Sequence, residues 1–362
     1  MANALPTNDS RAHRERLVAA AGGARDLAVT ARVLGEWFTA RIGAPTEVTN
    51  LHGPEGAGIA NETWLLDART GHELHRFVLR VKPKEVVLFP DPDFDGLFRL
   101  LDLLHREQLV RVPEVLWLEE DEAVLGAPFL VMRMFEGRVP VTNPVYTQHG
   151  WVAEATPEQR RTFWTTAVDE LARIHCVPGE LVSFIGWPQY GETGEDQQLG
   201  YWDHYRDWSR VPETDDMIEL REWIGANRPH EPGIALSWGD ARPGNMIFGP
   251  DFRLLGVLDW DQMSLASPRH DLSWWLLFDE LNTTGRGIPR PEGIGSREET
   301  IERWEAITGQ QVGDLSWHTA FTTWKLGLIT LLMMLGANYG DDAAHAAAAS
   351  IVGVGRRAAG LE

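Results

Sequence analysis

The sequence is poor in cysteine, in positive charge and in long apolar runs. Its single cysteine, Cys176, excludes an intramolecular disulfide and any zinc site built from several cysteines. Lys and Arg together number 33 against 53 Asp and Glu, so the formal net charge is −20. Such a surface repels nucleic-acid phosphates, and we therefore expect no nucleic-acid partner.

Targeting and membrane signals are also scarce. Residues 1–16 mix Asn, Asp, Arg and His and contain no apolar signal-peptide core. The strongest apolar run, Leu326–Ala337, has about twelve residues, well below the ~20 that span a bilayer. We expect this run to be a buried helix, and the protein to be cytoplasmic with no membrane partner.

The 362 residues are enough for two modest domains or one large one. Period-two patterns predict strands in the first third of the chain. One helix is expected before the first three strands and a second helix after them. After Gly137 the pattern becomes mainly helical, beginning with an amphipathic helix over Pro157–His175. We therefore predict an α+β protein with a sheet-rich lobe over residues 1–135 and a helical lobe over 136–362. The predicted N-terminal elements are helices 26–42 and 97–109 and strands 47–51, 61–67, 76–81, 112–118 and 128–134.

The most informative segment lies between two predicted short strands, 234–238 and 254–260. Asp240 is followed by Asn245 five positions later and by Asp259 nineteen positions after Asp240. In phosphoryl transfer, a protein mainly positions groups and neutralises charge. One carboxylate must orient the attacking hydroxyl, and further carboxylate and amide oxygens must hold Mg²⁺, which prefers oxygen ligands. This spacing therefore predicts a kinase-type site, with Asp259 returning beside the loop on the second strand.

The same block carries a family resemblance. It resembles the aminoglycoside phosphotransferase and choline kinase-like superfamily, and within it the kinase-like domains related to those fused to some acyl-CoA dehydrogenases. The resemblance covers roughly residues 46–277 and implies a bilobal protein-kinase-like fold with ATP as co-substrate. Its motifs are Trp-Gly-Asp-Ala-Arg-Pro-Gly-Asn at 238–245, Leu-Asp-Trp-Asp at 258–261 and Pro-Arg-His-Asp-Leu at 268–272.

Each matching position acquires an expected role from this resemblance. Asp240 matches the catalytic aspartate, and Arg242 lies where a cation can stabilise charge on the transferring phosphoryl group. Asn245 and Asp259 match the Mg²⁺ ligands. Asp271 matches a buried aspartate that braces the catalytic loop.

The nucleotide side of the resemblance starts with a glycine-rich segment between two predicted strands. Gly56, Gly58 and Asn61 are similar to the family's phosphate-binding loop, since glycines let backbone N–H groups approach phosphate oxygens. Ala60 stands where a serine hydroxyl is usual, so one phosphate contact is expected to be missing.

A second cation and an adenine slot are expected from the following strands. Arg80 stands where a strand lysine normally pairs the nucleotide phosphates, and Lys82, on the same face, is a competing candidate. Met132 and Met134 match the strand and hinge beside adenine. An ordinary core strand with no role in adenine binding would show the same apolar pattern. The helix position that usually supplies a partner glutamate is Leu97, which cannot pair; Asp93 or Asp95 could substitute.

Three further residues depart from the family pattern or need no chemistry. Trp238 replaces the histidine that usually begins the signature, so we predict preserved catalysis with altered support of the loop. His175 and His270 read as packing residues, and neither shows zinc-ligand spacing to a second histidine.

The leading hypothesis is an ATP- and Mg²⁺-dependent phosphotransferase acting on a hydroxyl of a small molecule. The aromatic and acidic stretch 187–208, with Tyr190, Trp202 and Glu195, is a candidate lining for a cationic or sugar-like substrate, while an anionic acyl-type substrate remains open. The alternatives are a catalytically silent nucleotide-binding regulator of the same fold, and a hydrolase in which Asp259 and Asp261 share one strand face as metal ligands.

Overall fold

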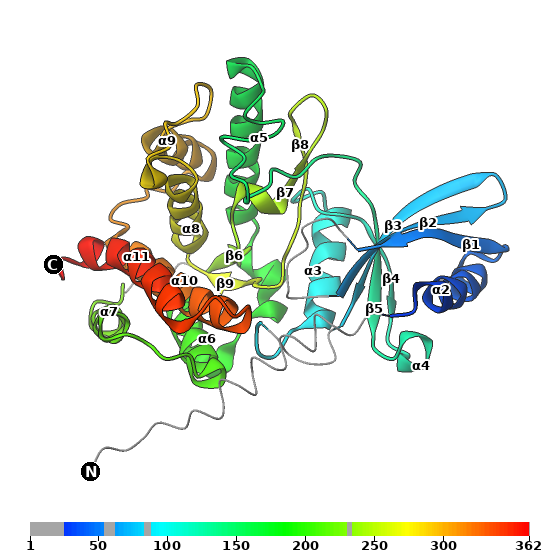
Figure 1. The fold of residues 1–362 in the computed structure, drawn as a ribbon, viewed down its shortest axis with the longest axis horizontal. Helices are drawn as coiled ribbons and strands as arrows, with labels where there is room; N and C mark the ends of the chain where they lie inside the picture. The colour runs from blue at the N-terminus through cyan, green and yellow to red at the C-terminus, as the bar shows by residue number, and fades with distance from the viewer. Residues whose placement is uncertain (1–24, 54–61, 83–87, 230–233, 362) are drawn as a thin grey trace, which may run out of the picture. The chain divides into compact units, whose positions relative to one another are not determined.

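The computed structural model describes residues 25–53, 62–82, 88–229 and 234–361. The chain divides into two compact units, each described here by itself. Unit 1 comprises Met1–Asp102, Pro113–Met134 and Leu332–Gly340, and unit 2 comprises Leu103–Val112, Phe135–Leu331 and Asp341–Glu362. The elements of both units are labelled in Figure 1.

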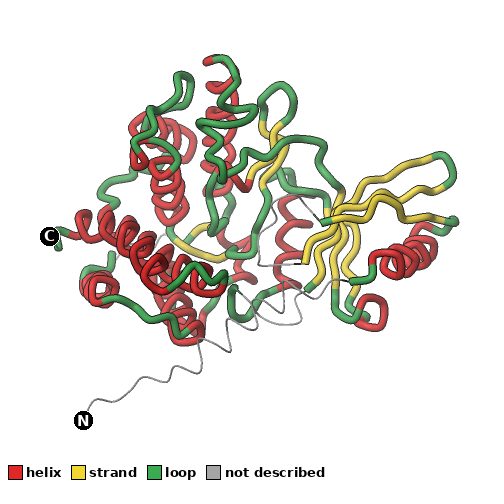
Figure 2. Tube along the Cα trace, in the orientation of Figure 1, coloured by secondary structure: helices red, strands yellow, loops and turns green. Residues whose placement is uncertain are grey.

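Unit 1 is built around one antiparallel five-stranded sheet in the order β1-β2-β3-β5-β4. Its strands are drawn as one twisted group of arrows in Figure 1 and in yellow in Figure 2. The strands and helices that begin in this part of the chain are α2 (Leu27–Ile42), β1 (Thr46–His52), β2 (Glu62–Thr70), β3 (Glu73–Val81), α3 (Phe94–Arg106), β4 (Val115–Glu119), α4 (Glu122–Leu125) and β5 (Phe129–Arg133).

Strand alternation gives the sheet one face that packs into the core of unit 1. Phe77, Leu79 and Val81 of β3 are at most 2% exposed and pack with Leu34 and Phe38 of α2. The sequence starts α2 at Asp26, whose carboxylate accepts hydrogen bonds from the backbone N–H groups of residues 28 and 29. The apolar stripe of α2 thereby covers one side of the sheet and leaves the alternate residues of β3 on the other.

The predicted elements of unit 1 are largely present, with two corrections. α3 spans Phe94–Arg106 rather than 97–109, because Asp93 accepts a hydrogen bond from Gly96 N at 2.8 Å and starts the helix earlier. The expected acidic turn before β5 contains a short helix, α4, which Asp121 caps.

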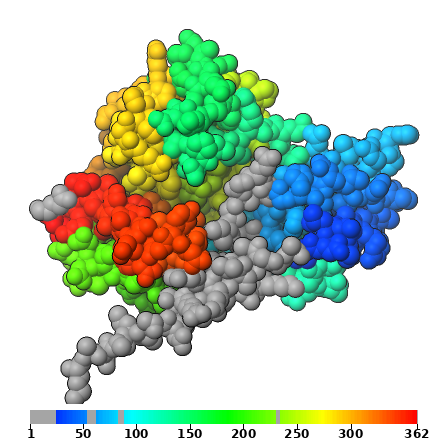
Figure 3. Space-filling model, viewed as in Figure 1, coloured from blue at the N-terminus to red at the C-terminus, as the bar shows by residue number. Residues whose placement is uncertain are grey.

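Unit 2 is mainly helical. α5 begins at a capping box between Thr156 and Gln159 and has the predicted span, with Trp164, Val168, Leu171 and Ile174 buried along it. The helices after it are α6 (Gly194–Ser209), α7 (Asp215–Ala226), α8 (Pro268–Leu281), α9 (Arg297–Thr308), α10 (Ser316–Gly336) and α11 (Asp341–Ala359), shown in red in Figure 2. α11 lies at the surface of this unit (Figure 3). The predicted α+β class, an antiparallel N-terminal sheet followed by a helical C-terminal region, is confirmed.

Two short antiparallel strand pairs interrupt the helices and frame the candidate site. β6 (Ala235–Ser237) pairs with β9 (Ser264–Ala266), and β7 (Met246–Phe248) pairs with β8 (Leu254–Val257). The prediction of only two strands here was wrong, because β7 and β9 are each three residues long and carry too few residues for a period to show. The predicted strand 254–260 also ends early, at Val257.

The predicted buried helix at 326–337 is the second half of a longer helix, α10. Among the described residues, α10 alone is long and apolar enough to cross a bilayer, with a mean hydropathy of 1.3 over its most apolar window. Since 72% of that window is buried inside the structure, α10 has the burial of a core helix.

Candidate active site

The loop between β6 and β7 carries Asp240 and Asn245. It turns at Gly239, whose φ of +91° suits glycine and whose pro-Cβ position lies 2.2 Å from the backbone oxygen of Gln262. A single 3-10 turn at Pro243–Asn245 then returns the chain to β7. Any side chain at position 239 would displace the backbone near Gln262, so the loop path requires glycine there.

The carboxylate of Asp240 accepts hydrogen bonds from three side chains. Trp274 Nε1 donates to Oδ1 at 2.8 Å, Asn245 Nδ2 donates to Oδ2 at 2.6 Å, and Arg242 Nε lies 3.1 Å from both oxygens. All three donors come from unit 2, and charge-assisted bonds of this kind are among the stronger ones in proteins. Asp240 is therefore held in one orientation while remaining partly exposed.

The contacts of Asn245 determine which way its amide points. Its NH₂ group faces the Asp240 carboxylate and also donates to the Asp240 backbone oxygen at 3.1 Å. Among the described residues its amide oxygen accepts no hydrogen bond, so this oxygen is available as a ligand. The backbone oxygen of Asn245 accepts from Leu258 N at 2.8 Å, which ties the loop to the chain just before Asp259.

Asp259 lies two residues after the end of β8, with its side chain exposed and its backbone in the left-handed region at φ 58°. A non-glycine residue in this conformation costs about 1–3 kcal/mol and often marks a functional position. Because Met246 pairs with Val257 across the β7–β8 hairpin, Asn245 lies opposite Leu258, the residue before Asp259. Asp259 was expected on a strand and is not; the shared strand face with Asp261, on which the hydrolase alternative depended, does not exist.

Trp238 joins the two parts of the site. Its indole N–H donates to the backbone oxygens of Leu258 at 2.9 Å and Asp259 at 3.1 Å, and the side chain is fully buried. An indole has one N–H to donate and no acceptor, which suits two carbonyl oxygens. The altered loop support that the sequence predicted at this position thus takes the form of a bridge from the Asp240 loop to the Asp259 segment.

Asp271, in the first turn of α8, holds the backbone of the loop. Its buried carboxylate accepts from Trp238 N at 2.6 Å, Gly239 N at 2.9 Å, Ser237 Oγ at 3.0 Å and His175 Nε2 at 3.2 Å. Burial alone would raise the pKa of Asp271, but the hydrogen bonds from His175 and from the two backbone amides outweigh it, and the pKa is lowered. These contacts hold the loop backbone in place, which is the role that the resemblance implied for Asp271.

His175 has its tautomer determined by a tryptophan. The indole of Trp304 donates to His175 Nδ1 at 2.8 Å, so Nδ1 is the acceptor and Nε2 carries the proton given to Asp271. His175 is fully buried and makes no contact with the Asp240 carboxylate, in keeping with the packing role expected of it.

Lys325 of α10 is a buried cation beneath the loop, and the sequence analysis did not single it out. Its Nζ donates to the Gly239 backbone oxygen at 2.9 Å and lies 4.2 Å from the ring centre of Trp274 and 4.8 Å from that of Trp202. Burial lowers the pKa of Lys325 to about 8, while the charges of Asp240 and Asp271 act in the opposite direction. A lone lysine beside a long apolar run was the available sequence signal, because lysine is rarely buried without a partner.

Arg242 has partners on three sides. Besides Asp240, its Nη1 donates to Thr142 Oγ1 at 3.1 Å, and its guanidinium carbon lies 5.6 Å from the ring centre of Phe278. The guanidinium is about a quarter exposed, at 23%, so part of it remains accessible to a ligand.

The nucleotide candidates lie in unit 1 where they fall within the described residues. Arg80 of β3 pairs with Leu130 and, like Val78 and its partner Met132, lies on the sheet face opposite Leu79. Arg80 and Met132 are therefore on one face and both are buried, at 9% and 7% exposure. Met134 is half-buried and its N–H donates to the Arg76 backbone oxygen at 3.0 Å.

Two nucleotide expectations have no such support. Gly56, Gly58, Ala60 and Asn61 lie outside the described residues. Asp93 was offered as a substitute partner for the strand cation, but its carboxylate caps α3, and neither Asp93 nor Asp95 forms an ion pair within the described chain.

The proposed aromatic substrate lining at 187–208 was wrong for several of its members. Trp202 and Glu195 are 1% exposed and belong to the interior, because residues 194–209 form α6 and turn these side chains inward. Trp274, which lies outside the motifs quoted above, comes three residues after Asp271 on α8, and that spacing places both on one helix face.

The comparison with known families settles the class of the chain. The sequence profile of the APH phosphotransferase enzyme family matches residues 54–312, well over half of the chain. The chain belongs to this family. The match includes the Asp240 loop, Asp259 and Asp271, so the resemblance stated from the motifs is confirmed.

Curated relatives carry this family's region within longer proteins. The chain is 27% identical over 321 residues to the probable acyl-CoA dehydrogenase IBR3 of Arabidopsis thaliana, a match covering 80% of this chain and 37% of that protein. It is 26% identical over 241 residues to human acyl-CoA dehydrogenase family member 11, covering 66% of this chain and 29% of the relative. The chain thus spans about a third of the length of these relatives.

Solved structures show the same fold. A candidate aminoglycoside phosphotransferase from Ralstonia eutropha superimposes with a TM-score of 0.70 at 22% identity, covering 91% of this chain and 98% of that one. A thermostable mutant of the aminoglycoside phosphotransferase APH(4)-Ia, in ternary complex with ADP and hygromycin B, gives a TM-score of 0.57 at 14% identity, covering 90% and 98%. At these identities the likeness establishes the kinase-like fold.

Proposed function

We propose that the protein is an ATP- and Mg²⁺-dependent phosphotransferase that moves the γ-phosphoryl group to a hydroxyl of a small molecule. The observation that carries the proposal is the Asp240 carboxylate, held by Trp274, Asn245 and Arg242 at the surface of unit 2. A carboxylate fixed in orientation can accept a hydrogen bond from an attacking hydroxyl, and in phosphoryl transfer this positioning is the main task of the protein.

Asn245 and Asp259 have the chemistry that Mg²⁺ requires. The Asn245 amide oxygen takes no hydrogen bond among the described residues, and the exposed Asp259 directly follows Leu258, whose N–H donates to the Asn245 backbone oxygen. Mg²⁺ prefers oxygen ligands and keeps several waters, so one amide and one carboxylate are a fitting set. When bound, the ion would neutralise charge on the phosphates; the protein's own part is to hold these two oxygens in register through the Leu258–Asn245 backbone bond.

Arg242 is the residue whose partner would change during the reaction. A guanidinium binds phosphate oxygens with the same fork that it offers to a carboxylate. Exchange of the Asp240 carboxylate for phosphate oxygens would place positive charge on the transferring group and leave an Asp240 oxygen for the substrate hydroxyl. Arg80 and the apolar side chain of Met132, on one sheet face of unit 1, are the proposed contacts for the nucleotide phosphates and the adenine base, with Met134 and the segment of Gly56, Gly58 and Asn61.

The names of the relatives suggest where to look for the substrate. Since the curated relatives are named as acyl-CoA dehydrogenases and the structural neighbours as antibiotic phosphotransferases, we propose testing hydroxyacyl thioesters beside aminoglycosides and macrolides. We further propose that the protein works in the cytoplasm without a nucleic-acid or membrane partner, in keeping with its formal charge of −20.

The test is ADP formation from Mg-ATP with a panel of amino-alcohols, sugars, aminoglycosides, macrolides and hydroxyacyl thioesters. We expect turnover on at least one member, and we expect Asp240→Ala to abolish turnover while nucleotide binding, measured by calorimetry, is retained. Thr142→Val is the matched control because it removes an Arg242 contact without touching Asp240.

A second function remains as the alternative, a nucleotide-binding regulator without catalysis. The absence of a family glutamate at Leu97, a buried leucine in this chain, favours it. A nucleotide-dependent thermal shift with no ADP formed from any panel member would select the regulator over the enzyme, and ADP formation unaffected by Asp240→Ala would overturn the assignment of Asp240.

A further inference from the structure

Three polar side chains meet in the interior of unit 2, apart from the residues that hold the Asp240 carboxylate. Glu195, His270 and His318 each belong to the first turn of a helix, α6, α8 and α10 respectively. They are 1%, 6% and 1% exposed, and one ligand atom from each lies within 4.8 Å of the others. The motifs gave no sign of this cluster, since its members are far apart in the sequence.

None of these side chains satisfies its polar atoms within the described chain. Both carboxylate oxygens of Glu195, both ring nitrogens of His318 and Nε2 of His270 are buried without a hydrogen-bond partner. The shortest approach recorded between them, from His318 Nε2 to Glu195 Oε1, is 3.9 Å, beyond hydrogen-bond range. A buried carboxylate and imidazoles left in this state would cost several kcal/mol, so the cluster requires a further binding partner.

The backbone around the cluster is tightly held. A Cβ at Gly194 would lie 2.9 Å from the Ala266 backbone, so the start of α6 packs directly against the chain that leads into α8. On the other side, the Trp317 indole donates to the Ile224 backbone oxygen at 2.8 Å and anchors the start of α10 to α7. The starts of α6 and α8 are thus packed together, and the start of α10 is anchored to α7, by contacts that do not involve the cluster itself.

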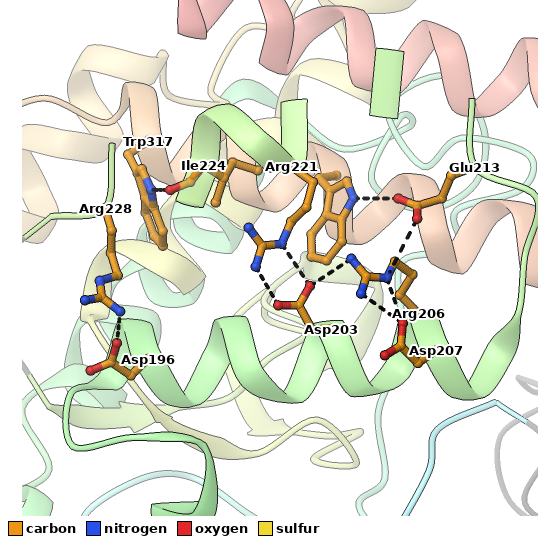
Figure 4. A network of polar contacts seen from close by, with 10 residues as sticks. Asp196, Asp203, Arg206, Asp207, Glu213, Arg221, Ile224, Arg228 and Trp317 are labelled. Carbon is orange, nitrogen blue, oxygen red and sulfur yellow. Dashed lines mark hydrogen bonds and ion pairs between the residues drawn. The ribbon is translucent and has the colours of Figure 1, made fainter. Parts of the chain in front are cut away.

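Ion pairs along α6 reinforce this arrangement. Asp203 of α6 is bound to Arg221 of α7, as Figure 4 shows, and Arg221 Nε lies 2.9 Å from Asp203 Oδ1. Glu213 accepts a hydrogen bond from the indole of Trp324 at 3.1 Å. Asp196, the residue after Glu195, pairs with Arg228 at the edge of the same network. The position of Glu195 is therefore fixed by its neighbours, and the cluster is preformed.

The walls of the cluster are aromatic. Trp317 and Phe321 lie edge-on to the His270 ring, with centroids at 5.7 and 4.9 Å. The charged groups that act on it from neighbouring positions are Lys325, Arg269 and Asp314. Burial lowers the pKa of both imidazoles, while the Glu195 carboxylate acts in the opposite direction on His318.

We propose that Glu195, His270 and His318 bind a zinc ion. Two imidazole nitrogens and one carboxylate form a set typical of Zn²⁺, which takes ligands at about 2.0–2.2 Å with a water completing four-coordination. Ligand atoms around such an ion are about 3.4 Å apart, so the 3.9 Å pair needs to close by roughly half an ångström, and no pair, at up to 4.8 Å, by more than about 1.4 Å, which side-chain torsions can supply. Imidazole favours Zn²⁺ over Mg²⁺ or Ca²⁺, which separates this site from the one proposed at Asn245 and Asp259.

The ion would cross-link α6, α8 and α10. His270 directly precedes Asp271, which holds the backbone of the Asp240 loop, so zinc would stiffen the turn that supports the loop without contacting the reacting groups. The proposal does not depend on phosphoryl transfer, and the two can fail separately.

The test measures metal directly on the full-length, tag-free chain, purified without chelator. Inductively coupled plasma mass spectrometry is expected to find about one zinc per chain, and removal by a chelator followed by added Zn²⁺ is expected to raise Tm by several degrees. Co²⁺ in place of zinc should give visible d–d absorption, and a crystal recorded at the zinc edge should place an anomalous peak among the three side chains.

Glu195→Gln and His318→Gln should lower the zinc content at least tenfold and abolish the Tm response. The matched control is His345→Gln, at a half-buried histidine of α11 that does not belong to the cluster, and it should retain about one zinc. Circular dichroism shows whether the variants fold; if they do not, the anomalous peak and cobalt spectrum of the unmodified chain decide. A chain that holds no stoichiometric metal, shows no Tm response to Zn²⁺ and has an ordered water at the cluster would overturn the proposal.

Discussion

The sheet of unit 1 and the Asp240 loop of unit 2 hold their candidate site residues in different ways. Arg80 and Met132 share a face because alternation and the β3–β5 register put them there, and both can be derived from a few neighbouring residues. Asp240 instead is oriented by Trp274 of α8, and the loop behind it by Asp271 and Lys325, from further along the chain. A strand face is a local property, whereas the geometry of the Asp240 loop depends on distant partners.

Asp271→Asn should give the largest effect if the loop depends on distant contacts. An asparagine turns an NH₂ group toward donors that now meet a carboxylate, so buried backbone N–H groups of the loop lose their acceptor. We expect a loss of about 3–5 kcal/mol in the free energy of unfolding, measured by urea denaturation.

Asp251→Asn is the control for this change, because its carboxylate is 62% exposed and its turn bond to Arg253 N survives in asparagine. It should cost less than about 0.5 kcal/mol. Equal effects of the two variants would mean that Asp271 is not a brace.

Lys325→Met should change how stability depends on pH. The pKa of Lys325 falls from 10.5 to about 8 on folding, so the unfolded chain binds more protons between those values and the unfolding free energy rises with pH there. The shift in pKa corresponds to a rise of roughly 3 kcal/mol in the unfolding free energy between pH 8 and 10.5, and the methionine variant should lack this rise. The free energy of unfolding is measured by urea denaturation at several pH values for the wild type and for Lys325→Met. Lys82→Met, at a half-buried lysine, is the control. If the unfolding free energy of the wild type and of Lys325→Met changes with pH in the same way, the lowered pKa of Lys325 is contradicted.

Trp238→Phe tests the bridge from the Asp240 loop to Asp259. Phenylalanine keeps most of the ring but leaves the carbonyl oxygens of Leu258 and Asp259 without the indole donor. We expect about 2 kcal/mol of destabilisation and a rise in the Mg²⁺ concentration required for half-maximal ADP formation.

Trp164→Phe is the matched control, since the buried Trp164 indole N–H has no hydrogen-bond partner in the part of the chain that the structure describes. It should leave the Mg²⁺ dependence unchanged. A shift of the same size in both variants would assign the effect to packing.

Arg80→Lys probes the locally determined side of the comparison and should have the smallest effect on stability. A lysine retains the charge but not the planar fork, so the KM for ATP should rise by about tenfold with little change in kcat. Arg76→Lys, on the same face of β3 with a 45% exposed side chain, is the control. If KM does not move, Lys82 is the next candidate for the phosphate contact.

Much of the fold could be predicted because its signals are local. α2 and α5 follow from a cap and an apolar period, and the sheet strands follow from alternation. α6 was missed because its inward face mixes Glu195, Tyr201 and Trp202, a pattern that looks like a polar binding surface until the neighbours that bury it are known. The three-residue β7 and β9 are too short to show a period.

The site shows the same division. The spacing of Asp240, Asn245, Asp259 and Asp271 identified the family, since those residues lie in one short stretch. Trp274 and Lys325 could not be assigned to the same place without the helix packing, and neither could the meeting of Glu195 with His270 and His318.

By itself, the sequence determined the class of fold, the family and the chemical identity of the groups between Asp240 and Asp271, because those properties depend on residue type and short spacing. Only the tertiary structure decided the left-handed backbone at Asp259, the bridge made by Trp238 and the buried surroundings of Lys325 and the Glu195 cluster. The physical reason is that hydrogen bonding and burial are set by residues that come together only when the chain is folded.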